Sequence, residues 1–318
     1  MNEDELKIPV YVVTGFLDSG KTSFLNYTIA QDYFQIDEPT LLIACEEGEE
    51  EYDARRLLRY HTTLTQIESE EDFTPARLRK LNRKFRPDRV IIEYNPLWGI
   101  KNLWEMELPD DWEIVQQIVT VDASTFSVYV NNMKSLFAEM SQNADMVIFN
   151  RSSSDMPLAS FRRSIKVVNP ACEVLFEDME GNLTDFTESQ LPYDTDGDVI
   201  EIDDVDYGIF YVDAGENPDT YDGKTVHFKG QVLKSQKEDA DVFVPGRRAM
   251  TCCADDTAFI GYLCKSKNAP RLEMGSWVDV TATIRYRYVK MYGGEGPVLY
   301  AKKIAKAEPP KSELVYFT

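Results

Sequence analysis

The feature that most restricts what this chain can fold into is a phosphate-binding loop motif near its N-terminus. Residues 15–22 read GFLDSGKT and fit the pattern G-x-x-x-x-G-K-[ST]. They follow an apolar run over residues 10–13 that predicts a strand, and they precede an expected helix over 21–31 whose N-terminal dipole favours an anion. The motif therefore predicts binding of a nucleoside triphosphate. The residues expected to contact it are Gly15, Asp18, Ser19, Gly20, Lys21, Thr22 and Ser23.

Length and charge both predict two domains. The 318 residues exceed what one hydrophobic core usually organises. Residues 177–222 hold sixteen Asp or Glu and no Lys or Arg, whereas the chain from residue 223 onward carries sixteen Lys or Arg against ten Asp or Glu. We predict an NTPase domain over 1–185, an acidic linker over 186–206 and a second domain over 207–318.

The composition predicts a protein of the cytoplasm. Hydrophobic residues make up 43% of the chain, and no run approaches the roughly 18 apolar residues of a membrane helix, so the chain is not expected to span a bilayer. The acidic N-terminus lacks the basic start and apolar centre of a signal peptide. Five cysteines without a disulfide-rich layout suit a reducing compartment.

Upstream of residue 177, short β-branched runs alternate with stretches of helical spacing. This pattern predicts an α/β domain with a doubly wound, mostly parallel sheet, in which ligands bind beyond the carboxyl ends of the strands. Strands are expected over 10–13, 41–44, 89–92, 118–121, 146–149 and 174–176, and helices over 21–31, 53–60, 75–84, 124–140 and 156–165.

Carboxylates follow three of these strands and are candidates for holding Mg²⁺ together with the Thr22 hydroxyl. Glu93 ends an apolar run as a Walker B acid does, and we expect it to contact the metal or to position water; exposure at a strand end is the alternative. Glu46 starts an acidic run, so it either serves the metal and the reaction or is merely exposed. Asp122 could bind Mg²⁺ or cap the helix expected from Ser124. Lys21 would stabilise the charge of the transferred phosphoryl group.

Several motifs, in this order along the chain, resemble the CobW-type branch of P-loop GTPases, which is linked to metallochaperone and cobalamin-related metal handling. TGFLDSGKT at 14–22 resembles that family's TGFLGSGKT, EEGE at 46–49 with Asp53 resembles NEFGE…D, Glu93 stands at the acid of E-T-x-G, 121–123 resembles VDA, and 144–150 with 169–170 resembles ADxxxxNK…NP. The likeness covers residues 8 to about 177. It implies GTP hydrolysis with Mg²⁺, a nucleotide contact at Asn150 and a role in metal homeostasis.

Three departures from the family pattern affect these implications. The metal-binding C-x-C-C is missing, because residues 61–88 contain no cysteine. Where NKxD would recognise guanine, residues 150–153 read NRSS, so that Ser153 replaces the carboxylate unless Asp155 substitutes for it; GTP and ATP therefore both remain open. Asp18 stands where glycine is common. A nucleotide-dependent regulatory or binding module with little turnover is the main alternative to an enzyme.

Residues 207–318 predict a small all-β, OB-like barrel. Alternating runs at 224–232, 258–263, 277–284 and 297–304 suggest about five strands. GRRAMTCCADD at 246–256 resembles a motif of the YcgQ-like domain, which is found beside a predicted permease; this implies a protein partner, such as a permease component. Cys252 and Cys253 could bind Zn²⁺ or Co²⁺, but consecutive strand residues face opposite sides, so apolar packing is the alternative.

A nucleic-acid adaptor is the third class of function. RYRYVKMY at 285–292 interleaves basic and aromatic side chains, as OB barrels that bind single strands do. Because the neighbouring acidic stretch would repel phosphate, nucleic acid is the least favoured partner. A homodimer is also left open by the sequence.

Overall fold

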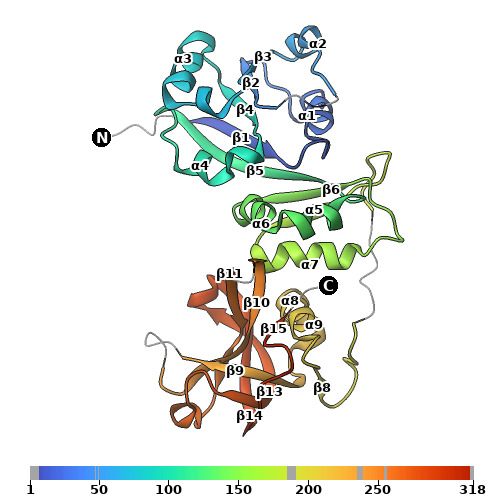
Figure 1. The fold of residues 1–318 in the computed structure, drawn as a ribbon, viewed down its shortest axis with the longest axis vertical. Coiled ribbons are helices and arrows are strands. Elements are labelled where there is room, and N and C mark those ends of the chain that lie inside the picture. The colour runs from blue at the N-terminus through green and yellow to red at the C-terminus, as the bar shows by residue number, and fades with distance from the viewer. Residues whose placement is uncertain are drawn as a thin grey trace. The chain divides into compact units, whose positions relative to one another are not determined.

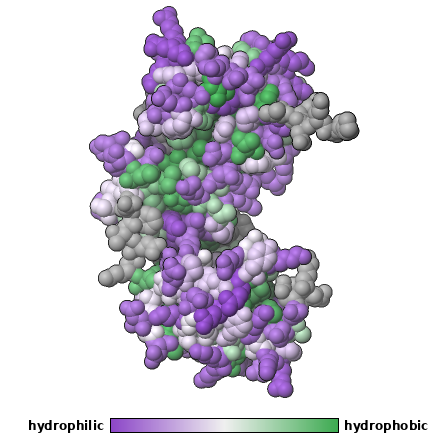
Figure 2. Space-filling view, turned by 180° about the vertical axis from the view of Figure 1, so that it is seen from behind, coloured by the Kyte–Doolittle hydropathy of each residue, from purple (hydrophilic) through white to green (hydrophobic). Residues whose placement is uncertain are grey.

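The computed structural model describes residues 7–46, 48, 50–184, 191–234, 239–253 and 256–315. The chain divides into two compact units, Met1–Phe186 and Thr187–Thr318, and each has a sheet of its own (Figure 1). Hydrophilic residues cover most of the face shown in Figure 2, where hydrophobic ones form smaller patches. No helix in the described residues has the length and apolar composition that crossing a lipid bilayer requires.

The first unit is built on a seven-stranded sheet of order β3-β2-β4-β1-β5-β6-β7, in which every neighbouring pair is parallel. The predicted doubly wound sheet is confirmed. Its central strands are buried on both faces, as parallel strands covered by helices must be. The strands are β1 Ile8–Thr14, β2 Thr40–Ala44, β3 Thr62–Gln66, β4 Arg89–Glu93, β5 Trp112–Asp122, β6 Met146–Asn150 and β7 Glu173–Phe176.

Helices pack on both faces of this sheet. Leu78 and Leu103 join Val12 in one core, while Leu25 joins Val13 in the core on the opposite face. The helix expected over 124–140 is interrupted at Met133 and forms two helices. The helices are α1 Lys21–Ile29, α2 Ala54–Leu58, α3 Pro75–Phe85, α4 Ile100–Glu105, α5 Phe126–Asn132, α6 Lys134–Gln142 and α7 Leu158–Val168, with 3-10 turns Glu70–Asp72 and Pro96–Trp98.

The second unit contains a closed five-stranded barrel. Its strands follow the order β10-β12-β14-β13-β9, and β9 pairs with β10 to close the ring. The predicted barrel is thus confirmed, although the helices before its first strand were not foreseen. The elements are β8 Ile200–Glu201, α8 Tyr207–Glu216, α9 Pro218–Tyr221, β9 Thr225–Leu233, β10 Val242–Cys253, β11 Asp256–Gly261, β12 Leu263–Lys265, β13 Trp277–Val289, β14 Gly294–Lys306 and β15 Leu314–Val315, with 3-10 turns Ala269–Arg271 and Lys290–Tyr292.

Part of the predicted linker belongs to the barrel unit. Strand β8 pairs in parallel with β9, and Asp204 accepts a 3.0 Å hydrogen bond from the guanidinium of Arg247 on β10. The Arg247 side chain is only 1% exposed, and it also donates to the carbonyl oxygen of Ser312 at 2.8 Å. A buried guanidinium needs such acceptors, because burial without them costs several kcal/mol. Asp204, in the predicted acidic linker, therefore supplies the counter-charge of Arg247 in the barrel.

Candidate functional site

The phosphate-binding loop joins β1 to α1 through backbone conformations that suit glycine. Gly15 has φ +149° and Gly20 has φ +89°. A Cβ atom on Gly15 would lie 2.3 Å from the Thr120 carbonyl oxygen, so no side chain fits there. Asp18 also lies in the left-handed region, with φ 58°, which explains why glycine is common at this position; aspartate tolerates it better than most residues.

Side chains of β5 and α5 hold the loop in place, and the loop ends at the N-terminus of α1. The buried Phe16 ring stacks on Tyr129, with centroids 4.5 Å apart, and the hydroxyls of Ser19 and Thr120 lie 2.9 Å apart. Gly20 is the N-cap residue of α1, and no side-chain cap hydrogen bond forms there among the described residues. A helix start of this kind offers its first N–H groups to phosphate.

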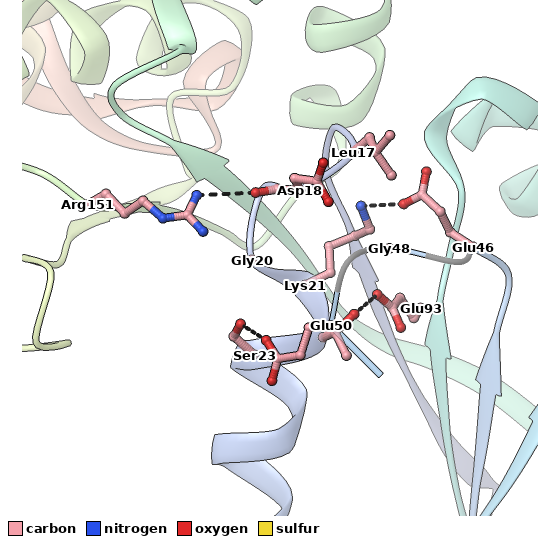
Figure 3. A pocket seen from close by; sticks show the side chains of 11 residues that line it. Leu17, Asp18, Gly20, Lys21, Ser23, Glu46, Gly48, Glu50, Glu93 and Arg151 are labelled. Atoms are coloured by element: carbon pink, nitrogen blue, oxygen red, sulfur yellow. Dashed lines mark hydrogen bonds and ion pairs between the residues drawn. The ribbon is translucent and has the colours of Figure 1, made fainter. Parts of the chain in front are cut away.

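Lys21 lies within the turn, where its ammonium has three oxygen partners. Nζ donates to the carbonyl oxygens of Gly15 and Phe16, both at 2.8 Å, and it lies 2.6 Å from Oε2 of Glu46. Figure 3 shows the Lys21 and Glu46 side chains pointing toward each other across the cavity. Both residues line one cavity, where they form an ion pair; their contacts with a nucleotide stay a prediction.

Glu93 lies at the end of β4 and is held by two hydroxyl groups. It is 2% exposed; Thr22 Oγ1 donates to its Oε1 at 2.9 Å and the Tyr52 hydroxyl donates to its Oε2 at 2.6 Å. Burial raises the pKa of the Glu93 carboxyl above its usual value, while the two hydrogen bonds act in the opposite direction. Glu93 is therefore not a solvent-exposed strand end, which was the alternative interpretation.

The phosphate-binding loop, Glu46 and Glu93 surround one cavity of about 180 Å³. Four carboxylates and two cationic groups surround it, so its charge is negative overall. A triphosphate would need a divalent cation to bind against this charge. The lining residues are Leu17, Asp18, Gly20, Lys21, Thr22, Ser23, Glu46, Gly48, Glu50, Glu93 and Arg151.

Two residues at the end of β6 contact the loop from the side. The Asn150 amide donates to the Ser19 carbonyl oxygen at 2.7 Å, while its Oδ1 is buried and has no hydrogen-bond partner among the described residues. Arg151 donates to the Asp18 carbonyl oxygen at 3.2 Å and to Oδ2 of Asp122 at 2.5 Å. Asn150 therefore holds an unused acceptor beside the loop, and Arg151 adds a positive charge.

Asp122 and Asp155 have partners close in sequence. Oδ1 of Asp122 accepts from the backbone N–H and the hydroxyl of Ser124, at 2.9 Å and 2.6 Å, and Asp122 does not line the cavity. This is the turn-capping use of Asp122; its magnesium contact stays a prediction. Ser153 donates to Asp155 at 2.5 Å, and this hydrogen bond lowers the pKa of the exposed Asp155 carboxyl.

The described thiols offer little to a soft metal ion. Burial, with Glu93 and Glu46 nearby, raises the pKa of Cys45 far above its usual value, so this thiol stays protonated. Within the described residues, no group of three or more His, Cys, Asp or Glu side chains is arranged to hold a metal ion. Cys252 and Cys253 end β10, but their side chains lie outside the described part of the structure. Metal binding at that pair stays a prediction.

Tyr52 and Glu50 make contacts at this site that the sequence did not predict. Glu50 accepts from the Ser23 hydroxyl, and from the Asn26 amide at 3.2 Å. Both residues belong to the acidic segment after β2, from which we singled out only Glu46. The one available signal was Tyr52 itself, an aromatic residue between this acidic run and Asp53, the N-cap of α2.

Two family models match the chain. The model described as "CobW/HypB/UreG, nucleotide-binding domain" matches residues 9–176, which is more than half of the chain, and the model described as "DUF1980 C-terminal domain" matches residues 179–317. None of the curated proteins compared with the chain matches it. The nucleotide-binding assignment of the first unit is therefore confirmed, whereas the YcgQ-like resemblance of the barrel stays a prediction.

The solved structures that resemble the chain include those of two proteins, HypB and YjiA. The hydrogenase maturation factor HypB from Archaeoglobus fulgidus is 16% identical, with a TM-score of 0.41, over 57% of this chain and 85% of that one. The Zn(II)-bound YjiA GTPase from E. coli is 19% identical, with a TM-score of 0.42, over 73% of this chain and 74% of that one.

Proposed function

Because the chain belongs to the CobW/HypB/UreG family of nucleotide-binding domains, we propose that it is a P-loop GTPase that binds GTP with Mg²⁺ and hydrolyses the γ-phosphate. One observation carries this proposal. The loop brings the uncapped start of α1, the Lys21 ammonium and the Thr22–Glu93 pair to a single cavity. This is the set of groups that phosphoryl transfer requires.

The donor atoms at the cavity fit Mg²⁺. The Thr22 hydroxyl and the Glu93 carboxylate are hard oxygen donors that already contact each other at 2.9 Å. Thr22 Oγ1 can offer a lone pair to the metal while its hydroxyl hydrogen stays hydrogen-bonded to Glu93, and Glu93 would hold the metal's water. When bound, the ion neutralises charge on the β- and γ-phosphates. Glu46 is the further oxygen donor proposed here.

The Lys21–Glu46 pair suggests how the site would act on a triphosphate. Phosphate oxygens would replace Glu46 as the acceptor for Lys21, and Glu46 would become available to hold an attacking water in line with the γ-phosphorus. The water oxygen forms the new P–O bond and gives up one proton, which leaves through Glu46 to the solvent. The bond from the γ-phosphorus to the bridging oxygen breaks, and its electron pair leaves with the nucleoside diphosphate. Lys21 and the loop N–H groups stabilise the charge that develops.

We propose GTP as the preferred nucleotide. The buried Oδ1 of Asn150, which has no partner among the described residues, is an acceptor suited to the edge of a base. Asp155 stays ionised near neutral pH, so it could accept the two N–H groups of guanine in place of Ser153. ATP has no such pair of donors, and Asp155 would not favour it.

The family's link to metal handling supports a cytoplasmic role in metal homeostasis. In this role the nucleotide state of the first unit would control contact between the barrel and a protein partner. Zn²⁺ or Co²⁺ would be cargo rather than a resident cofactor. A binding module with little turnover is the second candidate. The negative charge of the cavity and the Lys21–Glu46 ion pair both oppose the entry of a triphosphate and would slow each round of hydrolysis.

Calorimetric titration with GTP and with ATP, each with Mg²⁺, tests the proposal. Phosphate release is measured on the same samples, with Lys21→Ala as the inactive variant. Lys101→Ala, which removes an exposed lysine from α4, is the matched control. We expect GTP to bind more tightly than ATP and release to require Lys21; repeating the titration with Zn²⁺ and Co²⁺ tests for coupling to cargo.

The outcomes separate the candidates. GTP binding with phosphate release supports the enzyme, while binding without release supports the regulatory module. Absence of binding to either nucleotide would overturn both.

A further inference from the structure

The carboxylate of Glu93 is oriented by one donor on each of its oxygens. Thr22 donates to Oε1 and Tyr52 donates to Oε2. Thr22 is part of the phosphate-binding motif, so its contact with Glu93 belongs to the function proposed above. Tyr52 lies outside every motif considered, yet it makes the shorter of the two hydrogen bonds, at 2.6 Å.

The Tyr52 ring is fixed on two sides. It packs against the hydrophobic cluster beneath α1, which includes Leu25 and Leu57. The next residue, Asp53, caps α2 by accepting from the N–H groups of Arg55 and Arg56, at 2.9 Å and 3.2 Å. The core holds the Tyr52 ring and the helix cap holds the adjacent backbone, so the Tyr52 hydroxyl has little freedom to move. The fold therefore fixes this hydroxyl next to Glu93.

The segment that carries Tyr52 also reaches the start of α1. Glu50 accepts from Ser23 and from Asn26 on the first two turns of that helix. Tyr52 and Thr22 line a neighbouring cavity together. The acidic segment after β2 is thus joined both to the phosphate-binding helix and to the carboxylate at the end of β4.

We propose that Tyr52 is a positioning residue that orients Glu93 toward Mg²⁺ and thereby sets the affinity of the nucleotide site for the ion. The proposal rests on the proposed function. Residues that hold a metal's ligands in place typically change metal affinity by about 10- to 100-fold when they are removed. Tyr52 touches neither phosphate nor metal in this scheme, so its effect must pass through Glu93.

The test is the Mg²⁺ dependence of binding of a fluorescent GTP analogue. Tyr52→Phe keeps the ring and removes only the hydroxyl. We expect the Mg²⁺ concentration at half-maximal binding to rise about tenfold, while affinity measured in EDTA stays as in wild type. The melting temperature of the free protein should fall, because the buried Glu93 carboxylate loses a hydrogen-bond donor, but should stay above the assay temperature. Tyr60→Phe, which removes a hydroxyl from the same hydrophobic cluster, is the matched control and should shift nothing.

A double-mutant cycle shows whether Tyr52 acts through Glu93. In a Glu93→Gln background, Tyr52→Phe should produce no further rise in the Mg²⁺ requirement. An unchanged Mg²⁺ requirement in Tyr52→Phe, or an equal shift in both backgrounds, overturns the inference while leaving nucleotide binding intact. Failure of the wild-type protein to bind the analogue at any Mg²⁺ concentration would instead overturn the proposed function.

Discussion

The ammonium of Lys21 lies 2.6 Å from Oε2 of Glu46, and their side chains are only 3% and 11% exposed. In so dry a setting the two charges interact strongly, and a phosphate that binds Lys21 must compete with the carboxylate. Glu46→Gln removes the carboxylate charge but keeps a side-chain oxygen that can ligate Mg²⁺. At saturating Mg²⁺ it should therefore raise affinity for the nucleotide about tenfold, which corresponds to about 1.4 kcal/mol. Titration of a fluorescent GTP analogue at fixed Mg²⁺ measures this change.

The same substitution should slow hydrolysis if Glu46 holds the attacking water. Phosphate release under saturating GTP measures that rate separately from affinity. Glu51→Gln is the control, since it removes the same charge from an exposed position in the same segment. Weaker nucleotide binding in Glu46→Gln would contradict the competition between carboxylate and phosphate.

Gly15→Ala should damage the loop. The added Cβ would lie 2.3 Å from the Thr120 carbonyl oxygen, in a backbone conformation that other residues avoid. We expect a loss of about 1 to 3 kcal/mol in unfolding free energy and a loss of nucleotide binding. Chemical denaturation and GTP titration provide the two measurements. Gly294→Ala, where an added Cβ would meet open space, should leave both near wild type; a tolerated Gly15→Ala would mean that the loop relaxes.

The buried thiol of Cys264 should make the barrel less stable at alkaline pH. Burial raises the pKa of Cys264 from 9.0 to about 12. Between these values the unfolded chain loses the thiol proton while the folded chain keeps it, so unfolding becomes more favourable as the pH rises. Denaturation curves recorded across this pH range give the free energy of unfolding. This free energy should fall less steeply with pH in Cys264→Ala than in wild type. Parallel slopes would show that this thiol does not contribute.

Asp204→Asn should destabilise the barrel unit. The substitution leaves the Arg247 guanidinium, which is 1% exposed, without its counter-charge. Because Asp204 itself is 37% exposed and partly screened by solvent, we expect a loss of only about 1 to 2 kcal/mol. Thermal unfolding measures it, with the exposed neighbour Asp203→Asn as the control. Equal melting temperatures for the two variants would show that Arg247 is satisfied by its other contacts.

The sequence was sufficient to predict the features that depend on local pattern. The phosphate loop, the positions of the buried strands along the chain and the position of Glu93 at the end of one of them all follow from short motifs and apolar runs. Strand β3 was missed because its residues, TTLTQ, are mostly polar and lie at a sheet edge. Strand β10 was missed because it contains Pro245 and Gly246, which normally argue against a strand.

Contacts between distant parts of the chain were the main gap at the site. The Tyr52–Glu93 hydrogen bond joins residues 41 positions apart, and the Arg151–Asp122 pair joins residues 29 apart. Motif spacing predicts which residues reach the same edge of the sheet, but it does not predict which side chains then pair. Hence Glu46 could be nominated from the sequence, whereas its ion pair with Lys21 could not.

The short strand β8 determines where the barrel unit can be cut from the chain. A fragment that began at Tyr207 would omit Ile200 and Glu201, which pair with Val226 and His227 on β9. It would also omit Asp204 and expose an edge of the barrel to other chains. A separately expressed barrel must therefore retain the acidic residues ahead of α8, and a shorter piece should aggregate.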